Sequence, residues 1–415
     1  MNSARAIILV MDSVGVGQAD DAAAYGDVGS DTLGNIVEAA ANGNADQAGV
    51  RAGPLVSPNL ASMGIEGSAR ASRGRALAAS LGGRLEPDVA FGYAVPTSVP
   101  KGSTGGHWEI AGLRTTADWG HFGEDPAQPY PPELISRLVE ACELPGVIEV
   151  GRASGTEVIA HHGEQHLRTG EPIVYTSTDS VFQIAAHESV FGLERLYTVC
   201  EAARELCDEH RIARVIARPF VGSSADSFTR TEQRRDFSMP PHGPTLLGAL
   251  SESGMTVTTI GKIGDLFAHR GIYHEYPVTE LDEVFDQVLE SLDEQADPGL
   301  IFVNFCDFDS RYGHRRDVIG YANELERFDN RLSEVRCALG DEDLLIVTAD
   351  HGNDPTFGGS DHTRENVPVL VCGPGIASGD FGRRTSFADI GATAARHLGL
   401  VWTGAGTPIQ IESDS

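Results

Sequence analysis

The first candidate site residues are an adjacent aspartate and histidine with a second histidine shortly after them. TADHGND (348–354) places Asp350 beside His351 directly after an apolar segment, and His362 follows eleven residues after His351 in SDHTRE (360–365). Carboxylate and imidazole ligands without thiolates favour manganese, zinc or iron and disfavour calcium. These three side chains are therefore candidate metal ligands.

Two further segments extend the candidate ligands to six. DFDSRYGHRRD (307–317) contains Asp309, with His314 five residues later, and Asp12 follows the apolar segment AIILVM. Asp307 is an equal alternative to Asp309, because alternate residues of a strand point the same way. Six ligands suffice for two ions, and two ions about 3.5–4 Å apart can clamp both the attacking and the leaving oxygen of a phosphoryl transfer. The predicted chemistry is two-metal phosphoryl transfer.

A hydroxyl group that could attack phosphorus lies in KGSTGGHWE (101–109), which we expect to form a turn of small residues. Ser103 and Thr104 are both candidates, since a metal-bound hydroxyl loses its proton near neutral pH and can be phosphorylated. The neighbouring glycines allow close approach of the backbone. Ser13 is a third candidate, although such a serine more often caps a helix. The stretch GVG (15–17) does not complete a GxGxxG motif, so the sequence does not support a dinucleotide-binding fold.

The elements that must position these residues are buried strands alternating with helices. Apolar runs that end in polar or glycine residues predict strands at 5–12, 299–309, 344–350 and 367–373. Apolar residues repeat at three and four positions within 281–292 and 321–335, which predicts helices there. Such alternation indicates an α/β fold with a largely parallel sheet, in which sites form at the C-terminal ends of the strands. The three candidate aspartates lie at such ends.

The middle of the chain has a different composition. It opens with the loop HFGEDPAQPYPP and closes with Arg- and Pro-rich sequence, and it contains strand-like segments at 172–178 and 212–219 and a helix at 193–207. We interpret 118–240 as an inserted α/β cap domain. Residues 1–117 and 241–415 then form the metal-binding catalytic core.

Composition restricts the possible partners. The formal net charge is −29, which disfavours nucleic acid and anionic membranes, so a phosphate substrate needs local positive charge from cations and arginines. Only two of the 31 basic residues are lysines, Lys101 and Lys262, and both are candidates for substrate binding. Six scattered cysteines without a CxxC pair argue against a disulfide framework. The apolar run 6–11 is too short to span a bilayer and no signal-peptide pattern precedes it, so we expect a cytoplasmic protein.

Several motifs together resemble those of the phosphopentomutase family of the alkaline phosphatase superfamily, and the resemblance runs nearly end to end. The motifs are MDSVGVGQADDAAAYGDVGSDTLGNI (11–36), GHWEIAG (106–112), VYTSTDSVFQIAAHE (174–188), VIARPFVG (215–222), DFDSRYGHRRD (307–317), TADHGNDPTFGGSDHTRE (348–365) and TSFADIGATAA (385–395). The resemblance implies an alkaline-phosphatase-like core with an inserted cap. It also implies interconversion of ribose or deoxyribose 1-phosphate and 5-phosphate.

The resemblance assigns roles to individual residues. It implies two manganese ions, although other divalent cations are possible, and a sugar bisphosphate as activator. One ion would be held by Asp309, His314 and His362, which selects Asp309 over Asp307. The other would be held by Asp12, Asp350, His351 and the nucleophile, which corresponds to Ser103. The residues implied in sugar-phosphate binding are Ser177, Asp179, Val181, Arg218, Arg234 and Lys262.

The nucleophile segment departs from the family pattern. Where the family commonly has Lys-Asp-Thr-x-Thr-Gly-His-Trp-Glu, this chain has Gly102, Ser103 and Gly105 at the Asp and the two Thr positions. Serine can perform the same nucleophilic chemistry. The change keeps two alternatives open, a metal-dependent phosphatase of the same superfamily and a mutase for a modified sugar phosphate. A non-catalytic binding module is a third alternative and would need a closed, structural metal site.

Arginines in the predicted cap have two possible roles. Arg230, Arg234 and Arg235 form a basic cluster in an acidic chain. The cluster is either a solvated loop or a fork-shaped clamp for phosphate.

Overall fold

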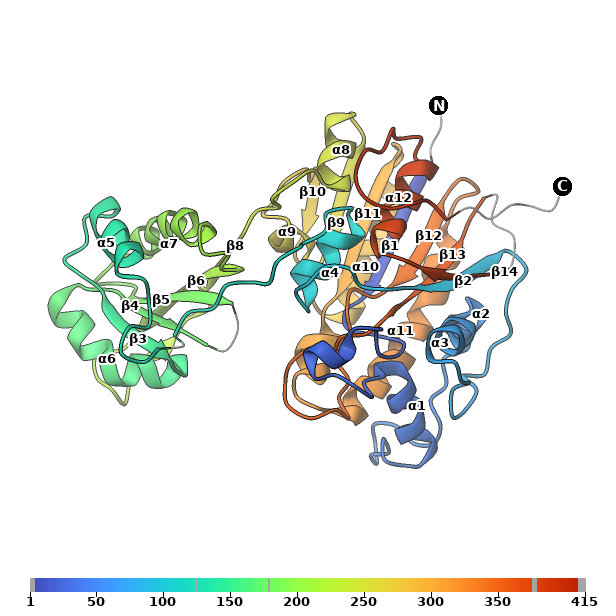
Figure 1. Ribbon diagram of the computed structural model, residues 1–415, viewed down its shortest axis with the longest axis horizontal. Coiled ribbons are helices and arrows are strands. Elements are labelled where there is room, and N and C mark those ends of the chain that lie inside the picture. The colour runs from blue at the N-terminus through green and yellow to red at the C-terminus, as the bar shows by residue number, and fades with distance from the viewer. Residues whose placement is uncertain (1–3, 124, 178–179, 375–378, 410–415) are drawn as a thin grey trace. The chain divides into compact units, whose positions relative to one another are not determined.

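The computed structural model describes residues 4–123, 125–177, 180–374 and 379–409. The chain divides into two compact units, one formed by Met1–Ala117 with Pro241–Ser415 and the other by Asp118–Pro240 (Figure 1). The second unit is therefore inserted into the sequence of the first.

An eight-stranded sheet forms the centre of the described part of the first unit. Its order is β10 (His274–Tyr276), β9 (Thr256–Ile260), β11 (Gly299–Phe305), β1 (Arg5–Met11), β12 (Leu344–Thr348), β13 (Val367–Cys372), β2 (Val89–Ala94) and β14 (Gly379–Arg384). Neighbours are parallel from β10 to β12, antiparallel on both sides of β13, and parallel between β2 and β14. Every residue of β11, β12 and β13 is buried, as expected for strands covered on both faces.

Helices surround this sheet. They are α1 (Thr32–Ala41), α2 (Pro58–Ser62), α3 (Ile65–Arg73), α4 (Ser103–Ile110), α8 (Leu246–Glu252), α9 (Ile263–Leu266), α10 (Leu281–Glu294), α11 (Val318–Ala338) and α12 (Ala388–His397). Helix α12 packs on β1, β12 and α4, whereas α10 packs on β11 and α11. These contacts hold α4 and the central strands in one body.

The sequence predicted this architecture correctly. The α/β class with a largely parallel sheet is confirmed, and the strands expected at 5–12, 299–309, 344–350 and 367–373 are β1, β11, β12 and β13. The two predicted helices are α10 and α11. The strand at 299–309 ends earlier than predicted, because the chain leaves the sheet after Phe305 and forms the π-helical turn Phe308–Gly313.

The second unit is a smaller α/β layer structure. Its sheet has the order β3 (Ile148–Arg152), β4 (Ile173–Thr176), β5 (Val181–His187), β6 (Arg214–Val221) and β7 (Thr229–Arg230), with β8 (Arg235–Ser238) also paired to β6. Helices α5 (Pro132–Ala141) and α7 (Leu193–Asp208) share one apolar core with one face of this sheet. Helix α6 (Gly155–Thr169) shares a second core with the other face. The predicted strands near 172–178 and 212–219 and the helix near 193–207 are thus present.

Within the described ranges, no helix combines the length and the apolar composition needed to cross a membrane.

Candidate metal centre and active site

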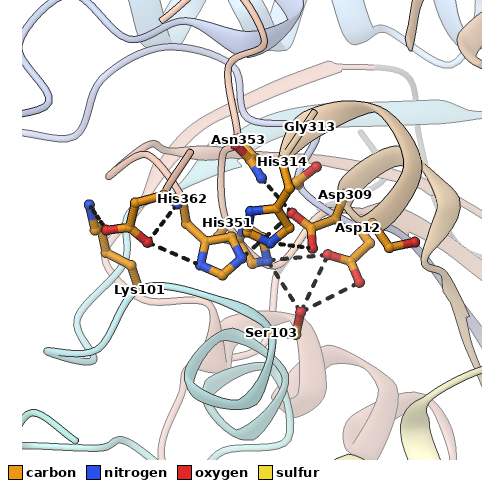
Figure 2. A network of polar contacts seen from close by, with 12 residues as sticks. Asp12, Lys101, Ser103, Asp309, Gly313, His314, His351, Asn353 and His362 are labelled. Carbon is orange, nitrogen blue, oxygen red and sulfur yellow. Dashed lines mark hydrogen bonds and ion pairs between the residues drawn. The ribbon is translucent and has the colours of Figure 1, made fainter. Parts of the chain in front are cut away.

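Asp309, His314 and His362 form the first of two side-chain clusters in the first unit (Figure 2). Asp309 lies in the turn Phe308–Gly313 after β11, and His314 is the next residue after that turn. The Nε2 atom of His314 is 3.3 Å from Oδ2 of Asp309, and Nε2 of His362 is 3.5 Å from Oδ1. The possible ligand atoms of the three side chains lie within 4.8 Å of one another, close enough to share one cation.

Asp12, Asp350 and His351 form the second cluster. Asp12 directly follows β1 and Asp350 lies just beyond β12. These strands are parallel neighbours, so their C-terminal ends meet at the same edge of the sheet. The Nε2 atom of His351 is 3.2 Å from Oδ1 of Asp12 and 3.3 Å from Oδ2 of Asp350.

The two clusters adjoin and are strongly coupled electrostatically. The rings of His351 and His362 are 4.4 Å apart between centroids. Burial by itself raises the pKa of Asp309, but the positive charge of His362 helps to hold this pKa well below its usual range. Burial lowers the pKa of His351, yet the carboxylates of Asp350 and Asp12 raise it to about 10. The carboxylates therefore favour any positive charge placed between them.

This donor set fits divalent cations. Asp12, Asp309 and Asp350 are each at most 4% exposed, and buried carboxylates need positive charge or metal coordination nearby. Oδ2 of Asp350 is 3.0 Å from Nδ1 of His107, but that nitrogen is also 2.9 Å from the carbonyl oxygen of Ser103. Nε2 of His351 also lies near this oxygen, at 3.3 Å. A buried carboxylate oxygen whose neighbours are imidazole nitrogens matches a metal ligand.

Backbone contacts fix which nitrogen of two histidines faces the clusters. Nδ1 of His351 is 3.0 Å from the carbonyl oxygen of Gly352, and Nδ1 of His314 is 2.7 Å from that of Ser360. If each Nδ1–H donates to its carbonyl, each Nε2 lone pair faces the carboxylates. This is the usual arrangement of histidine ligands.

Neighbouring amides orient the carboxylates, and sequence reasoning missed these residues. Nδ2 of Asn304 donates to Oδ2 of Asp12 at 2.9 Å, and Nδ2 of Asn353 donates to Oδ1 of Asp309 at 2.7 Å. Arg316 donates in turn to Oδ1 of Asn353. A signal for Asn304 was available, since it is the one polar residue in the apolar strand sequence GLIFVNF.

Ser103 lies beside the second cluster. Its Oγ atom is 3.5 Å from both carboxylate oxygens of Asp12 and 3.4 Å from Nε2 of His351. The prediction of a turn at this segment was wrong, because Ser103 is the first residue of helix α4. The helix approaches the second cluster closely, since a Cβ on Gly106 would lie 2.1 Å from the carbonyl oxygen of Asp350.

The alternative candidates have other surroundings. Oγ of Ser13 is 2.9 Å from the hydroxyl of Tyr321, and Ser13 has a φ of +75° and caps none of the described helices. Thr104 is the second residue of α4. Asp307 lies 3.2 Å from Nε of Arg311. Of these hydroxyl groups, that of Ser103 is the one placed against the candidate ligands.

The two lysines also lie near the clusters. Nζ of Lys101 is 3.0 Å from Oδ2 of Asp27 and 3.1 Å from Oδ2 of Asp361, so it joins the segment before α4 to the segment that carries His362. Nζ of Lys262 is 4.0 Å from Oδ2 of Asp12. The lysine positions thus differ, since one bridges carboxylates and the other faces the second cluster.

The remaining substrate candidates belong to the second unit. Ser177, Val181, Arg218 and Arg234 line one pocket of about 320 Å³ there. Asp179 lies outside the described residues.

Comparison with known proteins gives the family. Residues 4–401 match the family model of the metalloenzyme superfamily. A phosphopentomutase of Methylobacterium radiotolerans is 54% identical over 405 residues, which covers 98% of this chain and 99% of that protein. A phosphopentomutase of Rhizobium meliloti is 52% identical and covers 96% of this chain and 97% of its own length. A solved phosphoglycerate mutase of Leishmania mexicana covers 98% of this chain and 97% of its own, at 15% identity and a TM-score of 0.43. With identities this high over nearly the whole length, the chain belongs to the phosphopentomutase family, within the metalloenzyme superfamily.

Proposed function

We propose that this chain interconverts ribose or deoxyribose 1-phosphate and the corresponding 5-phosphate, with Ser103 as the group that carries the phosphoryl. Family membership supports the reaction. The observation that carries the assignment to Ser103 is the position of its Oγ atom, 3.4–3.5 Å from Asp12 and His351. We further propose two manganese ions as the metals and a sugar bisphosphate as the activator.

The proposed reaction consists of two phosphoryl transfers. In the first, the bond between phosphorus and Oγ of phosphorylated Ser103 breaks, a new bond forms from phosphorus to the free hydroxyl oxygen of the sugar phosphate, and the proton of that hydroxyl passes overall to Oγ of Ser103. The product is a sugar bisphosphate. In the second transfer the other phosphate returns to Oγ of Ser103, which leaves the isomeric monophosphate. No water is consumed in either step.

The residues around Ser103 have distinct parts in this scheme. Asp309, His314 and His362 would hold one cation, and Asp12, Asp350 and His351 the other. When bound, the cations would lower the pKa of the serine hydroxyl and neutralise charge on the phosphoryl oxygens.

Helix α4 itself can stabilise the phosphoryl group. Ser103 is its first residue, and Gly102 before it provides no side-chain cap. The first N–H groups of the helix therefore remain available to phosphoryl oxygens, and the helix dipole favours negative charge at this end. Nδ2 of Asn304 donates to Oδ2 of Asp12 at 2.9 Å and so helps to hold that carboxylate beside Ser103.

The substrate's own phosphate is assigned to the arginine pocket of the second unit. Arg218 and Arg234 line it together with Ser177 and Val181, and planar guanidinium groups suit phosphate recognition. Lys262 is assigned to the substrate on the side of Asp12. Lys101, with its two carboxylate partners, is assigned mainly to charge balance beside the nucleophile.

The test follows the conversion of ribose 1-phosphate to ribose 5-phosphate with manganese and a sugar bisphosphate, beside a parallel assay of released phosphate. We expect interconversion with little phosphate release, and intact mass should show one phosphoryl group that phosphatase removes. Ser103→Ala should abolish the conversion and the added mass. Thr104→Ala is the matched control from the same helix turn and should retain both.

Other outcomes identify the alternatives. Net phosphate release without isomerisation would indicate a metal-dependent phosphatase. Conversion of another sugar phosphate in preference to ribose and deoxyribose phosphates would indicate a mutase for a modified sugar, which the glycines at 102 and 105 motivate. Full conversion by Ser103→Ala would contradict the assignment of the nucleophile.

A further inference from the structure

The pocket of about 320 Å³ in the second unit is lined by four arginines, Arg214, Arg218, Arg230 and Arg234. Arg214 and Arg218 lie on β6 four residues apart, so both side chains are on the face of the sheet that packs against α6. Arg230 lies on β7, which pairs with the end of β6. Two adjacent strands therefore bring guanidinium groups to one place in an otherwise acidic protein.

Two of these arginines have a carboxylate partner within the unit. Arg234 donates to both oxygens of Asp236, each at 2.7 Å, and Arg214 is 3.4 Å from the same carboxylate. The charge on Asp236 is thus already shared between two guanidinium groups. Arg234 is also exposed, at the rim of the pocket.

The other two arginines are held by neutral groups. Nε of Arg218 donates to Oε1 of Gln183 at 3.0 Å, and Nη2 of Arg230 donates to the hydroxyl of buried Tyr175 at 3.0 Å. Burial lowers the pKa of Arg218, and the charges of Arg234 and Arg230 lower it further. Among the described residues, two positive charges therefore face the pocket with neutral partners, Gln183 for Arg218 and Tyr175 for Arg230.

Arg230 has further features of a binding residue. Its Nε atom is buried and has no hydrogen-bond partner among the described residues, and an unpaired buried donor is unfavourable unless a ligand supplies an acceptor. The position of its guanidinium depends on Gly155, since a Cβ there would lie 1.4 Å from Nη2 of Arg230 and 2.5 Å from the hydroxyl of Tyr175.

A helix end reaches the same pocket. Ser154 and Gly155 line it, and they are the N-cap and the first residue of the fifteen-residue helix α6. Ser154 makes no side-chain cap hydrogen bond to the helix. The first N–H groups of α6 are therefore available to an anion, and the helix dipole adds partial positive charge.

We propose that Arg230 is a phosphate-binding residue of this pocket, paired with Arg218 and assisted by the N-terminus of α6, and that Tyr175 and Gly155 position it. This inference rests on the proposed function, because it deepens the assignment of the substrate's phosphate to this pocket. The ligand class is the dianion of a phosphate monoester. Its two charges match two guanidinium groups with neutral partners, whereas Arg234 shares its charge with Asp236.

The direct test compares Arg230→Gln with Arg235→Gln. Arg235 comes from the same basic cluster, but its guanidinium lies over the rings of Tyr197 and Phe237. Equilibrium binding of ribose 5-phosphate to the full chain is measured in the presence of a chelator, and KM and kcat are measured with manganese. Loss of a hydrogen bond to a charged phosphate should weaken binding and raise KM about 10- to 100-fold in Arg230→Gln. Arg235→Gln should change neither by more than about twofold.

Two further variants keep Arg230 and disturb its position. Gly155→Ala should displace the guanidinium and weaken binding as Arg230→Gln does. Tyr175→Phe should weaken binding less, because it removes one positioning bond. Tyr175→Phe should have little further effect in the Arg230→Gln background, since the two residues act through one hydrogen bond. These variants also keep the test valid if Arg230→Gln fails to fold, which circular dichroism would detect.

The outcomes separate this inference from the proposed function. Equal affinity and equal KM for Arg230→Gln and Arg235→Gln would overturn the role of Arg230 while leaving the mutase activity intact. If ribose 5-phosphate binding depends on Arg230 but the protein does not interconvert the two sugar phosphates, the proposed function is overturned. The role of Arg230 in phosphate binding then still stands.

Discussion

Glu109, the last residue of the GHWE motif, gives the sharpest test of how the nucleophile helix is held. It is fully buried near the end of α4. Its Oε1 atom accepts from Oγ1 of Thr97 at 2.8 Å, from Oγ of Ser386 at 2.8 Å and from the backbone N–H groups of Thr97 and Phe387, each at 3.0 Å. Its Oε2 atom accepts from the backbone N–H of Ser98 at 2.6 Å. The carboxylate thus joins α4 to two segments far away in the sequence.

Glu109→Gln changes this network without changing the size of the side chain. If the amide oxygen keeps the four donors at Oε1, the amide nitrogen faces the backbone N–H of Ser98 at the Oε2 position, and a backbone N–H cannot rotate away. Loss of one charge-assisted hydrogen bond is worth about 1.5–3 kcal/mol, and leaving a buried donor unsatisfied adds about 1–3 kcal/mol. The expected loss of stability is about 2.5–6 kcal/mol. This is a large fraction of the stability of a typical domain.

Native-state hydrogen exchange followed by mass spectrometry measures this loss within the first unit. Peptides from β1 and β12 should exchange faster in Glu109→Gln by the amount that corresponds to about 2.5–6 kcal/mol, or about 60- to 19,000-fold at 1.4 kcal/mol per factor of ten. Glu38→Gln is the matched control, because Glu38 is exposed on α1, and it should change stability by less than about 0.5 kcal/mol. Equal protection of these peptides from exchange in Glu109→Gln and Glu38→Gln would show that the Glu109 carboxylate does not hold α4 in this way.

Three further predictions concern the metal centre and the second unit. Gly102 has a φ of +96°, and a Cβ there would lie 2.7 Å from Nδ1 of His362, so Gly102→Ala should weaken manganese binding about 10- to 100-fold. Calorimetry should detect no such loss for Gly254→Ala, whose added Cβ would meet open space at a φ of +78°. Burial lowers the pKa of His166, whose Nε2 accepts from the backbone N–H of His187 at 2.9 Å. The unfolded chain therefore binds more protons, and the second unit should lose stability to urea as the pH falls below about 6.5, with a smaller loss in His166→Gln. A chelator should destabilise the first unit by about 2.7 kcal/mol for each ion removed, relative to manganese at a hundredfold excess over its Kd, and hydrogen exchange in the second unit should not change.

The sequence predicted the residues that follow strands more reliably than those placed by irregular turns. Asp12 and Asp350 come directly after strongly apolar segments, and the parallel pairing of β1 with β12 brings them to one edge. The apolar pattern of the sequence could not show whether Asp307 or Asp309 is the metal ligand, because it assigns both residues to the strand predicted at 299–309. The π-helical turn Phe308–Gly313 separates them, and its hydrogen bond from the N–H of His314 to the carbonyl of Asp309, at 3.0 Å, places these two side chains together.

Long-range packing explains what the sequence left out. Glycines at 105 and 106 suggested a turn, but they lie within α4, where Gly106 allows the helix to contact the backbone of Asp350. Similarly, Asn353 holds Asp309 from 44 positions away in sequence. Such contacts depend on which segments meet in the fold, and spacing along one chain does not contain that information.

The proposed activity depends on two cations, each held by one of the two clusters beside Ser103. Anomalous diffraction from crystals grown with manganese would locate these cations. We expect two manganese peaks, one among Asp309, His314 and His362 and the other among Asp12, Asp350 and His351 with Oγ of Ser103 at its side. Manganese bound elsewhere, or a single ion that leaves either group without metal at saturating concentration, would contradict the proposal of two cations.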